Sequence, residues 1–306
     1  MKMLWDIIVV GGGPAGLTAA LYALRAGKRC MIIEKGNFGG QIALTGKLQN
    51  YPAIAEISGE EYTEALMGQC FELGAEFELG EVIEVEKNSE CFELKTSDGE
   101  RHRSQAVILA LGTKKRALGL EREDFFQGNG VSYCALCDGA FYSGEEVAVV
   151  GGGNTAVEEA LMLSDICKKV YIIHRRDEYR AEEKTVSALR KRSNIEEVLN
   201  FELHSLNGEE NLSSVSVKNV LTGDIRDIKI SGLFILVGYL ASNSAFKALA
   251  PLDAQGFFDV DEGCESGTEG LFVAGDCRRK EVRQLVTAVS DGAVAATKAI
   301  KYLDSK

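Results

Sequence analysis

Short apolar runs alternate along this chain with longer segments of helical periodicity. Residues 7–10 and 30–34 have the near-continuous apolar character of buried strands. The segment between them carries Pro14, which the first turn of a helix tolerates, and Gly27, a frequent helix terminator. The pattern therefore predicts a strand, a glycine-rich turn, a helix and a second strand at the start of the chain.

The same order of elements recurs from residue 146. We expect a strand over 147–150, a glycine turn, a helix through residue 163 and a strand over 170–174. This is the βαβ unit of a parallel sheet. Each of the two units is followed much later by an apolar strand that ends in glycine, at 106–112 and at 233–238.

The positions of these strands predict how the chain divides into domains. A third apolar strand that ends in glycine, 271–275, lies near the C-terminus. The simplest architecture inserts the second unit into the first. The fold class is therefore α/β, with two Rossmann-like nucleotide-binding domains. One is discontinuous and holds residues 1–113 and 243–306, and the other holds residues 114–242.

Both glycine turns have the spacing of a dinucleotide-binding turn, Gly-x-Gly-x-x-Gly or Ala. They are residues 11–16 (GGGPAG) and 151–156 (GGGNTA). The first glycine allows the tight turn, the second lets the backbone approach a pyrophosphate, and the third position allows close packing of helix on strand. Glycine-rich turns also serve structure alone, but here a strand precedes and a helix follows each turn.

The residue that ends the second strand of each unit indicates which nucleotide is bound. Glu34 occupies this place in the first unit, where a carboxylate accepts hydrogen bonds from ribose hydroxyls and repels a 2′-phosphate. The same offset in the second unit falls on His174, followed by Arg175 and Arg176. Guanidinium groups pair with a 2′-phosphate, so the first unit favours FAD or NAD and the second favours NADPH. The alternative for His174, Arg175 and Arg176 is that they form a solvated strand end. The alternative for Glu34 is that it is an acidic residue on the surface.

Asp276 directly follows an apolar strand and a glycine. A carboxylate in that place can accept a hydrogen bond from a polyol hydroxyl. Beside the Glu34 site, it is interpreted as a contact to the ribityl chain of FAD.

Cys134 and Cys137 form a CxxC pair shortly before the second glycine turn. Such a pair is typical of a redox-active dithiol, and Asp138 next to it could move a proton during thiol–disulfide exchange. Gly139 is expected to permit a turn that exposes the pair. A zinc site is the first alternative, but the sequence offers no second CxxC and only three scattered histidines. An inert structural pair is the second.

Composition narrows the class of protein further. The formal net charge is −12, which disfavours nucleic acid as a partner because its phosphates require clustered Lys and Arg. No apolar run approaches the roughly 18 residues that span a bilayer. Asp6 interrupts the N-terminal apolar segment, so no signal peptide is expected. Eight sparse cysteines suit a reducing, cytoplasmic location.

Taken together, these motifs resemble the low-molecular-weight, bacterial-type thioredoxin reductases, and the resemblance covers essentially the whole chain. The matching stretches, by their residue numbers, are GGGPAG (11–16), GGQ (39–41), NYP (50–52), CALCDG (134–139), GGGNTA (151–156), HRRD (174–177), GD (275–276) and RQ (283–284).

The resemblance implies an FAD-containing homodimer in which electrons pass from NADPH to FAD, to the cysteine pair and on to thioredoxin. It implies that Cys137 is the flavin-side sulfur, that Cys134 attacks the protein substrate and that Asp138 is the acid/base. The FAD domain would be 1–113 and 243–306, and the NADPH domain 114–242. The implied FAD contacts are Gly11, Gly13, Pro14, Ala15, Glu34, Lys35, Gly40, Gln41, Asn50, Gly112, Asp276, Arg283 and Gln284. The implied NADPH contacts are Gly153, Asn154, Thr155, His174, Arg175, Arg176 and Arg180.

The sequence assigns no role to two residues, and it leaves several alternative functions. Asn129 replaces an arginine common in the family near the partner surface, and Cys277 has no assigned role. The alternative functions are NADPH-dependent flavin reduction of another dithiol or disulfide protein or carrier, such as ferredoxin or a peroxiredoxin-type partner, and oxidation of a small dithiol. A nucleotide sensor is the non-enzymatic alternative, and the cysteine pair argues against it.

Overall fold

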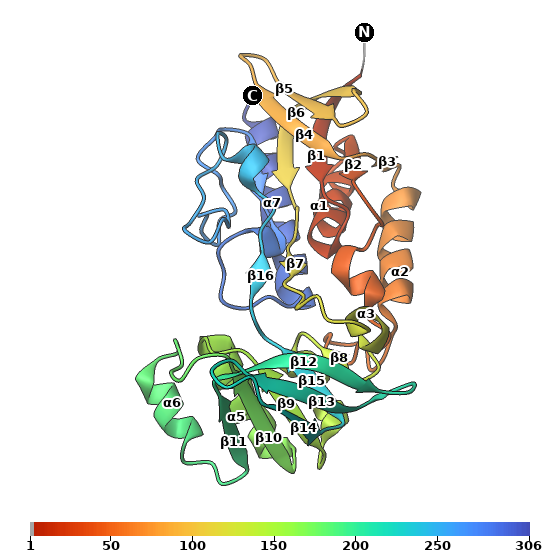
Figure 1. Cartoon of the computed structure of the whole chain (residues 1–306). Coiled ribbons are helices and arrows are strands. Elements are labelled where there is room, and N and C mark those ends of the chain that lie inside the picture. Colours follow the sequence, from red (N-terminus) through yellow and green to blue (C-terminus); the bar gives the residue numbers. More distant parts are fainter. Residues whose placement is uncertain (1–2) are drawn as a thin grey trace. The chain divides into compact units, whose positions relative to one another are not determined.

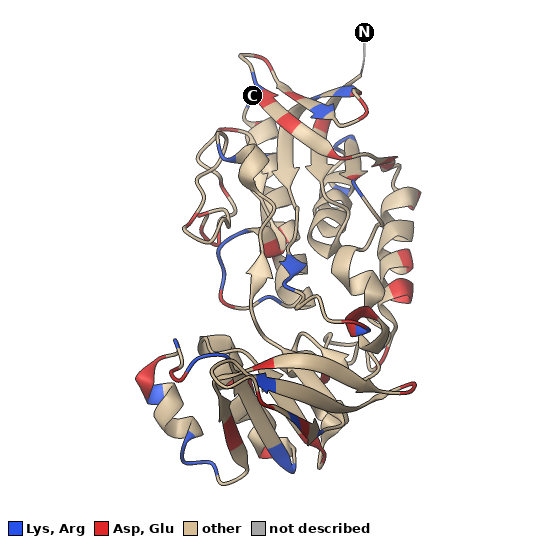
Figure 2. Cartoon of the chain, viewed as in Figure 1, with Lys and Arg blue, Asp and Glu red and all other residues tan. Residues whose placement is uncertain are grey.

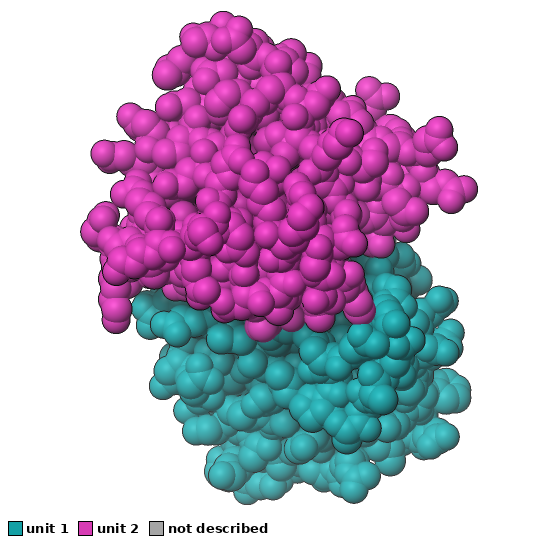
Figure 3. All heavy atoms as spheres, turned by 90° about the horizontal axis from the view of Figure 1, so that it is seen from below, with its two compact units in different colours: residues 1–114, 240–306 teal, residues 115–239 magenta. Residues whose placement is uncertain are grey.

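The computed structural model describes residues 3–306 and divides the chain into two compact units (Figure 3). Unit 1 comprises residues 1–114 and 240–306, and unit 2 comprises residues 115–239. Each contains one parallel βαβ unit with a glycine turn, so the predicted α/β class is confirmed. The expected boundaries after residues 113 and 242 lie a few residues from those of the units.

A seven-stranded mixed sheet forms the centre of unit 1 (Figure 1). Its order is β3-β2-β1-β6-β5-β4, and β17 also pairs with β6. The β4–β5 and β5–β6 pairs are antiparallel, and the remaining pairs are parallel. The strands are β1 (Leu4–Val10), β2 (Cys30–Glu34), β3 (Glu76–Leu79), β4 (Val82–Lys87), β5 (Phe92–Thr96), β6 (Arg101–Leu109) and β17 (Leu271–Val273).

Two helices lie side by side along this sheet, α1 (Pro14–Arg25) and α7 (Leu285–Asp304) (Figure 1). Their backbones approach closely because the facing residues are small: a Cβ on Gly292 would clash with the carbonyl oxygen of Ala15. Buried alanines of both helices join one apolar cluster with β1 and β6. The remaining helical segments of unit 1 are η1 (Gly40–Leu44), α2 (Gly59–Glu72), η3 (Ser244–Phe246) and η4 (Gly275–Cys277).

Unit 2 contains a five-stranded parallel sheet, β11-β10-β9-β15-β8, and a three-stranded antiparallel sheet, β12-β13-β14. Helices α5 and α6 pack with one face of the parallel sheet, and the antiparallel sheet contributes to the apolar cluster on the other. The parallel strands are β8 (Val131–Ser132), β9 (Glu146–Val150), β10 (Lys169–His174), β11 (Ile195–Leu199) and β15 (Gly232–Ile235). The antiparallel strands are β12 (Phe201–Gly208), β13 (Leu212–Asn219) and β14 (Ile225–Lys229). The helical segments are α3 (Glu123–Phe126), α4 (Ala135–Asp138), η2 (Gly139–Tyr142), α5 (Asn154–Ile166) and α6 (Glu183–Leu189).

The chain passes from one unit to the other at two short strands that pair with each other, β7 (Lys114–Lys115) and β16 (Tyr239–Leu240). Acidic and basic residues occur in both units, as the coloured ribbon of Figure 2 shows. Among the described residues, no helix is long and apolar enough to cross a membrane.

The predicted elements are present, with differences at their ends. The strand expected over 106–112 begins earlier, at Arg101, and ends at Leu109, because pairing with β1 stops at Val10 and Gly112 adopts a positive φ of 63°. The strand expected over 233–238 ends at Ile235, opposite Val150 of β9. Both differences reflect where the neighbouring strand ends, which local sequence does not specify.

Candidate active site

The first glycine turn is shaped by close backbone approaches. A Cβ on Gly11 would clash with the carbonyl oxygen of Ala110, and a Cβ on Gly16 would clash with that of Gly11. A Cβ on Gly13, by contrast, would meet nothing within 4 Å. The outer glycines therefore serve packing, and the middle one leaves open space at the N-terminus of α1, where a pyrophosphate could approach the backbone.

The second turn repeats this arrangement in unit 2. A Cβ on Gly151 would lie 2.5 Å from the carbonyl oxygen of Leu236, whereas a Cβ on Gly153 would again meet nothing within 4 Å. Neither α1 nor α5 has a side-chain cap or an acidic residue in its first turn. Helix α2, in contrast, begins with a complete capping box formed by Ser58 and Glu61. The two helix N-termini at the glycine turns thus keep backbone N–H groups available for an anion.

Glu34 is held against the first turn by two backbone donors. Gly12 N–H donates to its Oε2 at 2.7 Å, and Gly36 N–H donates to its Oε1 at 2.8 Å. Each carboxylate oxygen can accept a further hydrogen bond. The geometry therefore fixes a hydrogen-bond acceptor beside the turn, which suits the hydroxyls of an adenosine ribose.

The basic loop after β10 is tied to the second turn. Arg180 N–H donates to the carbonyl oxygen of Gly152 at 2.7 Å, and Glu182 N–H donates to Asn154 Oδ1 at 2.9 Å. Arg175, Arg176 and Arg180 are exposed, as is Thr155. The loop that carries the predicted arginines is thus held beside the glycine turn, and contact of these arginines with a nucleotide stays a prediction.

Unlike the exposed arginines that follow it, His174 points into the interior of unit 2. Its imidazole is buried, stacks on Tyr179 at a centroid distance of 5.6 Å and occupies the space that a Cβ on Gly152 would need. Burial lowers the pKa of His174, and the nearby arginines lower it further, so the ring is neutral near pH 7. Within residues 3–306 its Nε2 has no hydrogen-bond partner. A contact from this ring to a bound nucleotide stays a prediction.

Asp276 lies in η4, next to the N-terminus of α1. A Cβ on its neighbour Gly275 would lie 2.8 Å from the Cβ of Ala15, so the loop is packed against that helix. Burial raises the pKa of Asp276 to about 6, against the opposing effect of nearby Lys280 and Arg283. Its buried Oδ1 atom finds no donor in the part of the chain that the structure describes. A hydroxyl of the FAD ribityl chain would satisfy this atom, so the residues fit the cofactor.

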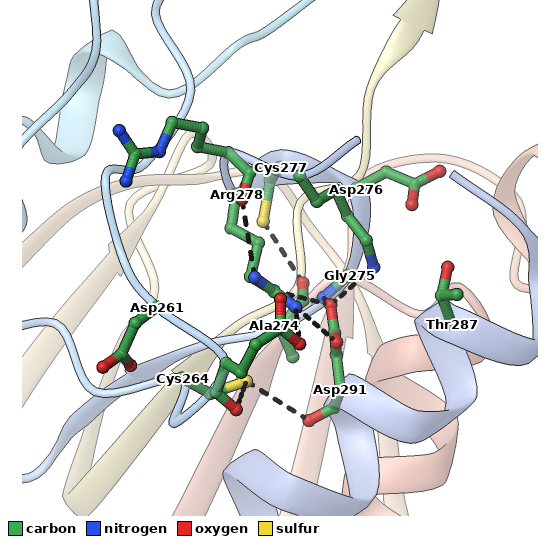
Figure 4. Close-up of polar contacts among 12 residues, drawn as sticks. Asp261, Cys264, Ala274, Gly275, Asp276, Cys277, Arg278, Thr287 and Asp291 are labelled. Atoms are coloured by element: carbon green, nitrogen blue, oxygen red, sulfur yellow. Dashed lines mark hydrogen bonds and ion pairs between the residues drawn. The ribbon is translucent and has the colours of Figure 1, made fainter. Parts of the chain in front are cut away.

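A buried charge cluster that the sequence did not indicate holds this loop in place (Figure 4). Arg278, 2% exposed, donates to both carboxylate oxygens of Asp291 on α7, at 2.8 and 2.9 Å. Lys280 Nζ and Gly275 N–H also donate to Asp291 Oδ2, at 2.8 and 3.0 Å. Burial raises the pKa of Asp291, but its bonds to Arg278 and Lys280 outweigh burial, so the pKa is lowered. One carboxylate thus joins η4, the loop after it and α7.

Other residues predicted to contact FAD also lie in unit 1. Gln41 Nε2 donates to the carbonyl oxygen of Thr113 at 2.8 Å, and Asn50 Nδ2 donates to Gln284 Oε1 at 3.2 Å. The Arg283 guanidinium lies over the ring of Phe257, at 4.3 Å from its centroid. Three further predicted contacts, Lys35, Gly40 and Gly112, carry no contact that identifies a ligand, so they stay predictions.

Cys134 and Cys137 are joined in a disulfide at the start of α4, with their Cα atoms 5.3 Å apart. Cys134 Sγ accepts a hydrogen bond from Cys137 N–H at 3.1 Å, so the pair also caps its own short helix. Cys134 is half-buried and Cys137 is exposed. Among the described residues, no group of three or more His, Cys, Asp and Glu side chains could hold a metal ion.

Asp138 is half-buried beside the disulfide. Burial raises its pKa, while a 2.6 Å hydrogen bond from the Ser132 hydroxyl and the charge of Lys115 act in the opposite direction. Ser132 Oγ also accepts from Cys134 N–H at 3.1 Å. It therefore links the predicted acid to the cysteine loop, a contact that the sequence did not reveal.

The prediction that Gly139 permits an exposing turn is wrong: Gly139 is buried with helical φ and ψ of −56° and −36°. A Cβ there would lie 2.9 Å from Leu163 Cδ2, so a larger residue would have to displace that side chain of α5. Cys277 is fully buried, and burial raises the pKa of its thiol to about 12, so it is not poised as a thiolate.

Comparison with known proteins decides the family. The sequence pattern of the pyridine nucleotide-disulphide oxidoreductases matches residues 5–292. The chain belongs to this family. It is accordingly a flavoprotein oxidoreductase that uses FAD and NADPH.

Relatives cover the chain from end to end. A thioredoxin reductase of Helicobacter pylori is 41% identical over 307 residues, which cover 98% of this chain and 99% of the relative. A thioredoxin reductase of Bacillus subtilis is 37% identical over 310 residues, with 99% and 96% covered. The crystal structure of thioredoxin reductase from Streptococcus pyogenes superimposes with a TM-score of 0.95 at 36% identity, covering 100% of both chains. That of Lactococcus lactis in its FR conformation gives 0.67 at 35% identity, covering 99% of this chain and 100% of the other.

Proposed function

We propose that this protein is a thioredoxin-disulfide reductase: two electrons pass from NADPH through FAD to the Cys134–Cys137 disulfide and on to a thioredoxin. The observation that carries the proposal is the disulfide, which closes in the same unit as the arginine-bearing nucleotide turn. Full-length similarity to proteins named thioredoxin reductase supports a thioredoxin as the substrate.

The chain's own residues divide the binding tasks between the units. In unit 1, Glu34 accepts the hydroxyls of the adenosine ribose of FAD, and Asp276 accepts a ribityl hydroxyl. In unit 2, Arg175 and Arg176 pair with the 2′-phosphate of NADPH, since exposed guanidinium groups beside the second turn match that anion. The N-terminus of each helix faces a pyrophosphate.

Asp138 supplies the proton chemistry at the dithiol. Reduction breaks the sulfur–sulfur bond with two electrons, leaving one thiolate, and one proton makes the other sulfur a thiol. A half-buried carboxyl with a raised pKa holds such a proton at its Oδ atoms, and Ser132 orients that carboxyl against the cysteine loop. Cys134 then attacks the disulfide of the protein substrate, and Cys137 resolves the mixed disulfide.

We further infer that unit 2 rotates against unit 1 during the cycle. Nicotinamide and disulfide, both carried by unit 2, each require contact with the flavin, and both cannot occupy the same place at once. The paired strands β7 and β16 form a narrow double crossing that suits a hinge. Solved relatives of nearly equal identity that superimpose at TM-scores of 0.95 and 0.67 support different unit arrangements within the family.

The experiment that tests the proposed function measures NADPH consumption by the purified holoenzyme with thioredoxin. Parallel reactions contain a glutaredoxin-like protein, a peroxiredoxin-type protein, ferredoxin or a small dithiol. Fast NADPH oxidation that requires thioredoxin and both cysteines supports the proposal. Turnover with ferredoxin in a Cys134→Ser variant, without thioredoxin reduction by the wild type, would contradict it.

The proposal also includes the oligomeric state of the protein, its location in the cell and the rotation of unit 2 against unit 1. We expect a homodimer in the cytoplasm, and light scattering after size-exclusion chromatography measures the mass directly. A bifunctional cross-link between unit 1 and unit 2 should spare one half-reaction and stop turnover. Full turnover in a verified cross-linked form would refute the rotation.

A further inference from the structure

A second carboxyl contacts the redox loop, and the chemistry described above does not use it. Glu159 lies on α5 and its Oε2 accepts a hydrogen bond from Ala135 N–H at 2.6 Å. Ala135 is the buried residue that follows Cys134 inside the CxxC. The helix that begins at the second nucleotide turn therefore also holds the dithiol loop.

The surroundings of Glu159 make its charge sensitive to nearby changes. The side chain is half-buried, and burial raises its pKa to about 6, assisted by the charge of Glu158 and opposed by the hydrogen bond from Ala135. The elements packed against α5 are α4, η2, α6 and the strands β9 and β10. Their titratable groups are Cys134, Cys137 and Asp138 around α4, Tyr142 in η2, Glu183 and Lys184 in α6, Glu146 in β9, and Lys169, Tyr171 and His174 in β10.

Reduction changes the charge on the same short helix that Glu159 holds. In the oxidised protein, the neutral Cys134 Sγ accepts Cys137 N–H, and Glu159 accepts Ala135 N–H. A thiolate formed at this loop would add a negative charge within two residues of Ala135, whose N–H group the Glu159 carboxylate accepts. Like charges at such proximity each favour the protonated form of the other.

We propose that Glu159 is a positioning residue of the redox centre, which ties the CxxC loop to α5 and takes up a proton when the Cys134–Cys137 disulfide is reduced. The proposal rests on the proposed dithiol function. Two electrons from NADPH break the sulfur–sulfur bond, one sulfur takes a proton, the other remains a thiolate, and the Glu159 carboxylate takes a second proton from solvent. The uncharged carboxyl still accepts Ala135 N–H through its carbonyl oxygen.

The test uses the NADPH-reduced holoenzyme and the rate at which iodoacetamide alkylates its cysteines between pH 5 and pH 9. Glu159→Gln keeps an acceptor for Ala135 N–H and removes the charge. Because removing a nearby negative charge lowers the pKa of the thiol by about half to one unit, alkylation at about pH 7.5, above the pKa of the Glu159 carboxyl, should rise about three- to tenfold. Asp165→Asn, on the exposed side of the same helix, removes an equal charge and should leave the profile unchanged.

Glu159→Ala separates positioning from charge. It should speed amide hydrogen exchange at Ala135 at least tenfold, and Glu159→Gln should restore slow exchange. Superimposable alkylation profiles for wild type and Glu159→Gln would overturn the proton linkage. Unchanged exchange at Ala135 in Glu159→Ala would overturn the positioning role.

The same experiment distinguishes failure of the proposed function. If NADPH does not reduce the wild-type disulfide, the electron route is wrong. Reduction by dithiothreitol then yields the same pair of thiols, and their alkylation profiles still decide the role of Glu159.

Discussion

The buried cluster around Asp291 gives a sharp prediction of stability. Asp291→Asn keeps the shape of the side chain but removes the buried counter-ion of Lys280 and leaves the guanidinium of Arg278 with only the exposed carboxylate of Glu262. Arg278 is 2% exposed, and the Lys280 side chain is 5% exposed. Removing one partner from a buried ion pair costs about 3–5 kcal/mol, because the remaining charge stays out of water. We expect the free energy of unfolding of unit 1 to fall by that amount.

The chain offers a matched control on the same arginine. Glu262 accepts from Arg278 Nη2 at 2.9 Å, as close as Asp291 does, but its side chain is 88% exposed. Solvent screens such a pair, and exposed ion pairs contribute at most about 1 kcal/mol. Glu262→Gln should therefore change stability by less than 1 kcal/mol, so burial rather than distance decides the outcome.

Trp5 makes the assay specific to unit 1. It is the single tryptophan of the chain and lies in β1, so its fluorescence during urea denaturation reports this unit even if the two units unfold separately. Equal losses for Asp291→Asn and Glu262→Gln, or a loss below about 1 kcal/mol for Asp291→Asn, would refute the reasoning.

The same residue predicts a dependence on pH. The pKa of Asp291 is lowered on folding, so its ionised form stabilises the protein above the unfolded value near 3.8. That stability is lost as the pH falls below this value toward the lower pKa of the folded state. The Trp5 unfolding midpoint should drop between pH 5 and pH 3 in the wild type, and by less in Asp291→Asn.

Three further predictions concern the nucleotides and the dithiol. Wild type should prefer NADPH over NADH in flavin reduction, and the double variant Arg175→Ala with Arg176→Ala should lose about 10- to 100-fold of that preference in stopped-flow measurements; equal rates in the wild type would refute the assignment. Cys134→Ser and Cys137→Ser should each abolish thioredoxin reduction in the NADPH assay while the flavin is still bleached, and residual activity above a few per cent would remove the pair from the mechanism. Because the pKa of Asp276 is about 6 and a hydroxyl donor favours the ionised form, FAD affinity should fall as pH drops from 7 to 5 in fluorescence titrations, and Asp276→Asn should flatten that trend.

The sequence predicted the features that depend on local spacing. The positions of Gly11 and Gly151 follow from the turn that each must make, and Glu34 and His174 follow from a fixed offset along a βαβ unit. A parallel βαβ unit has few ways to arrange its turn, so the spacing of the glycines was enough to predict the geometry of the turn. For the same reason the ends of strands were less predictable, since they depend on where a partner strand stops.

Contacts between distant segments could not be predicted. Glu159 reaches Ala135 across 24 positions, and Asp291 reaches Arg278 from a different helical segment. Nothing in the pattern around Asp291 distinguishes it from an exposed acid on an alanine-rich helix. The offset that located His174 did not indicate that its ring would fill the space beside Gly152. Packing decides these cases, and packing is a property of the assembled unit.

One such contact explains why a rotation of whole units is the motion to expect. Helix α5 begins at the second nucleotide turn, and Glu159 lies about 7.5 Å further along its axis. There it holds Ala135 by a 2.6 Å hydrogen bond, while Gly139 packs against Leu163 of the same helix. The nucleotide turn and the disulfide are thus fixed to a single rigid element. Neither can replace the other at the flavin by a local loop movement without breaking these contacts. We therefore expect exchange to carry unit 2 as one body about the β7–β16 crossing, and a variant that frees the loop from α5 should weaken this coupling.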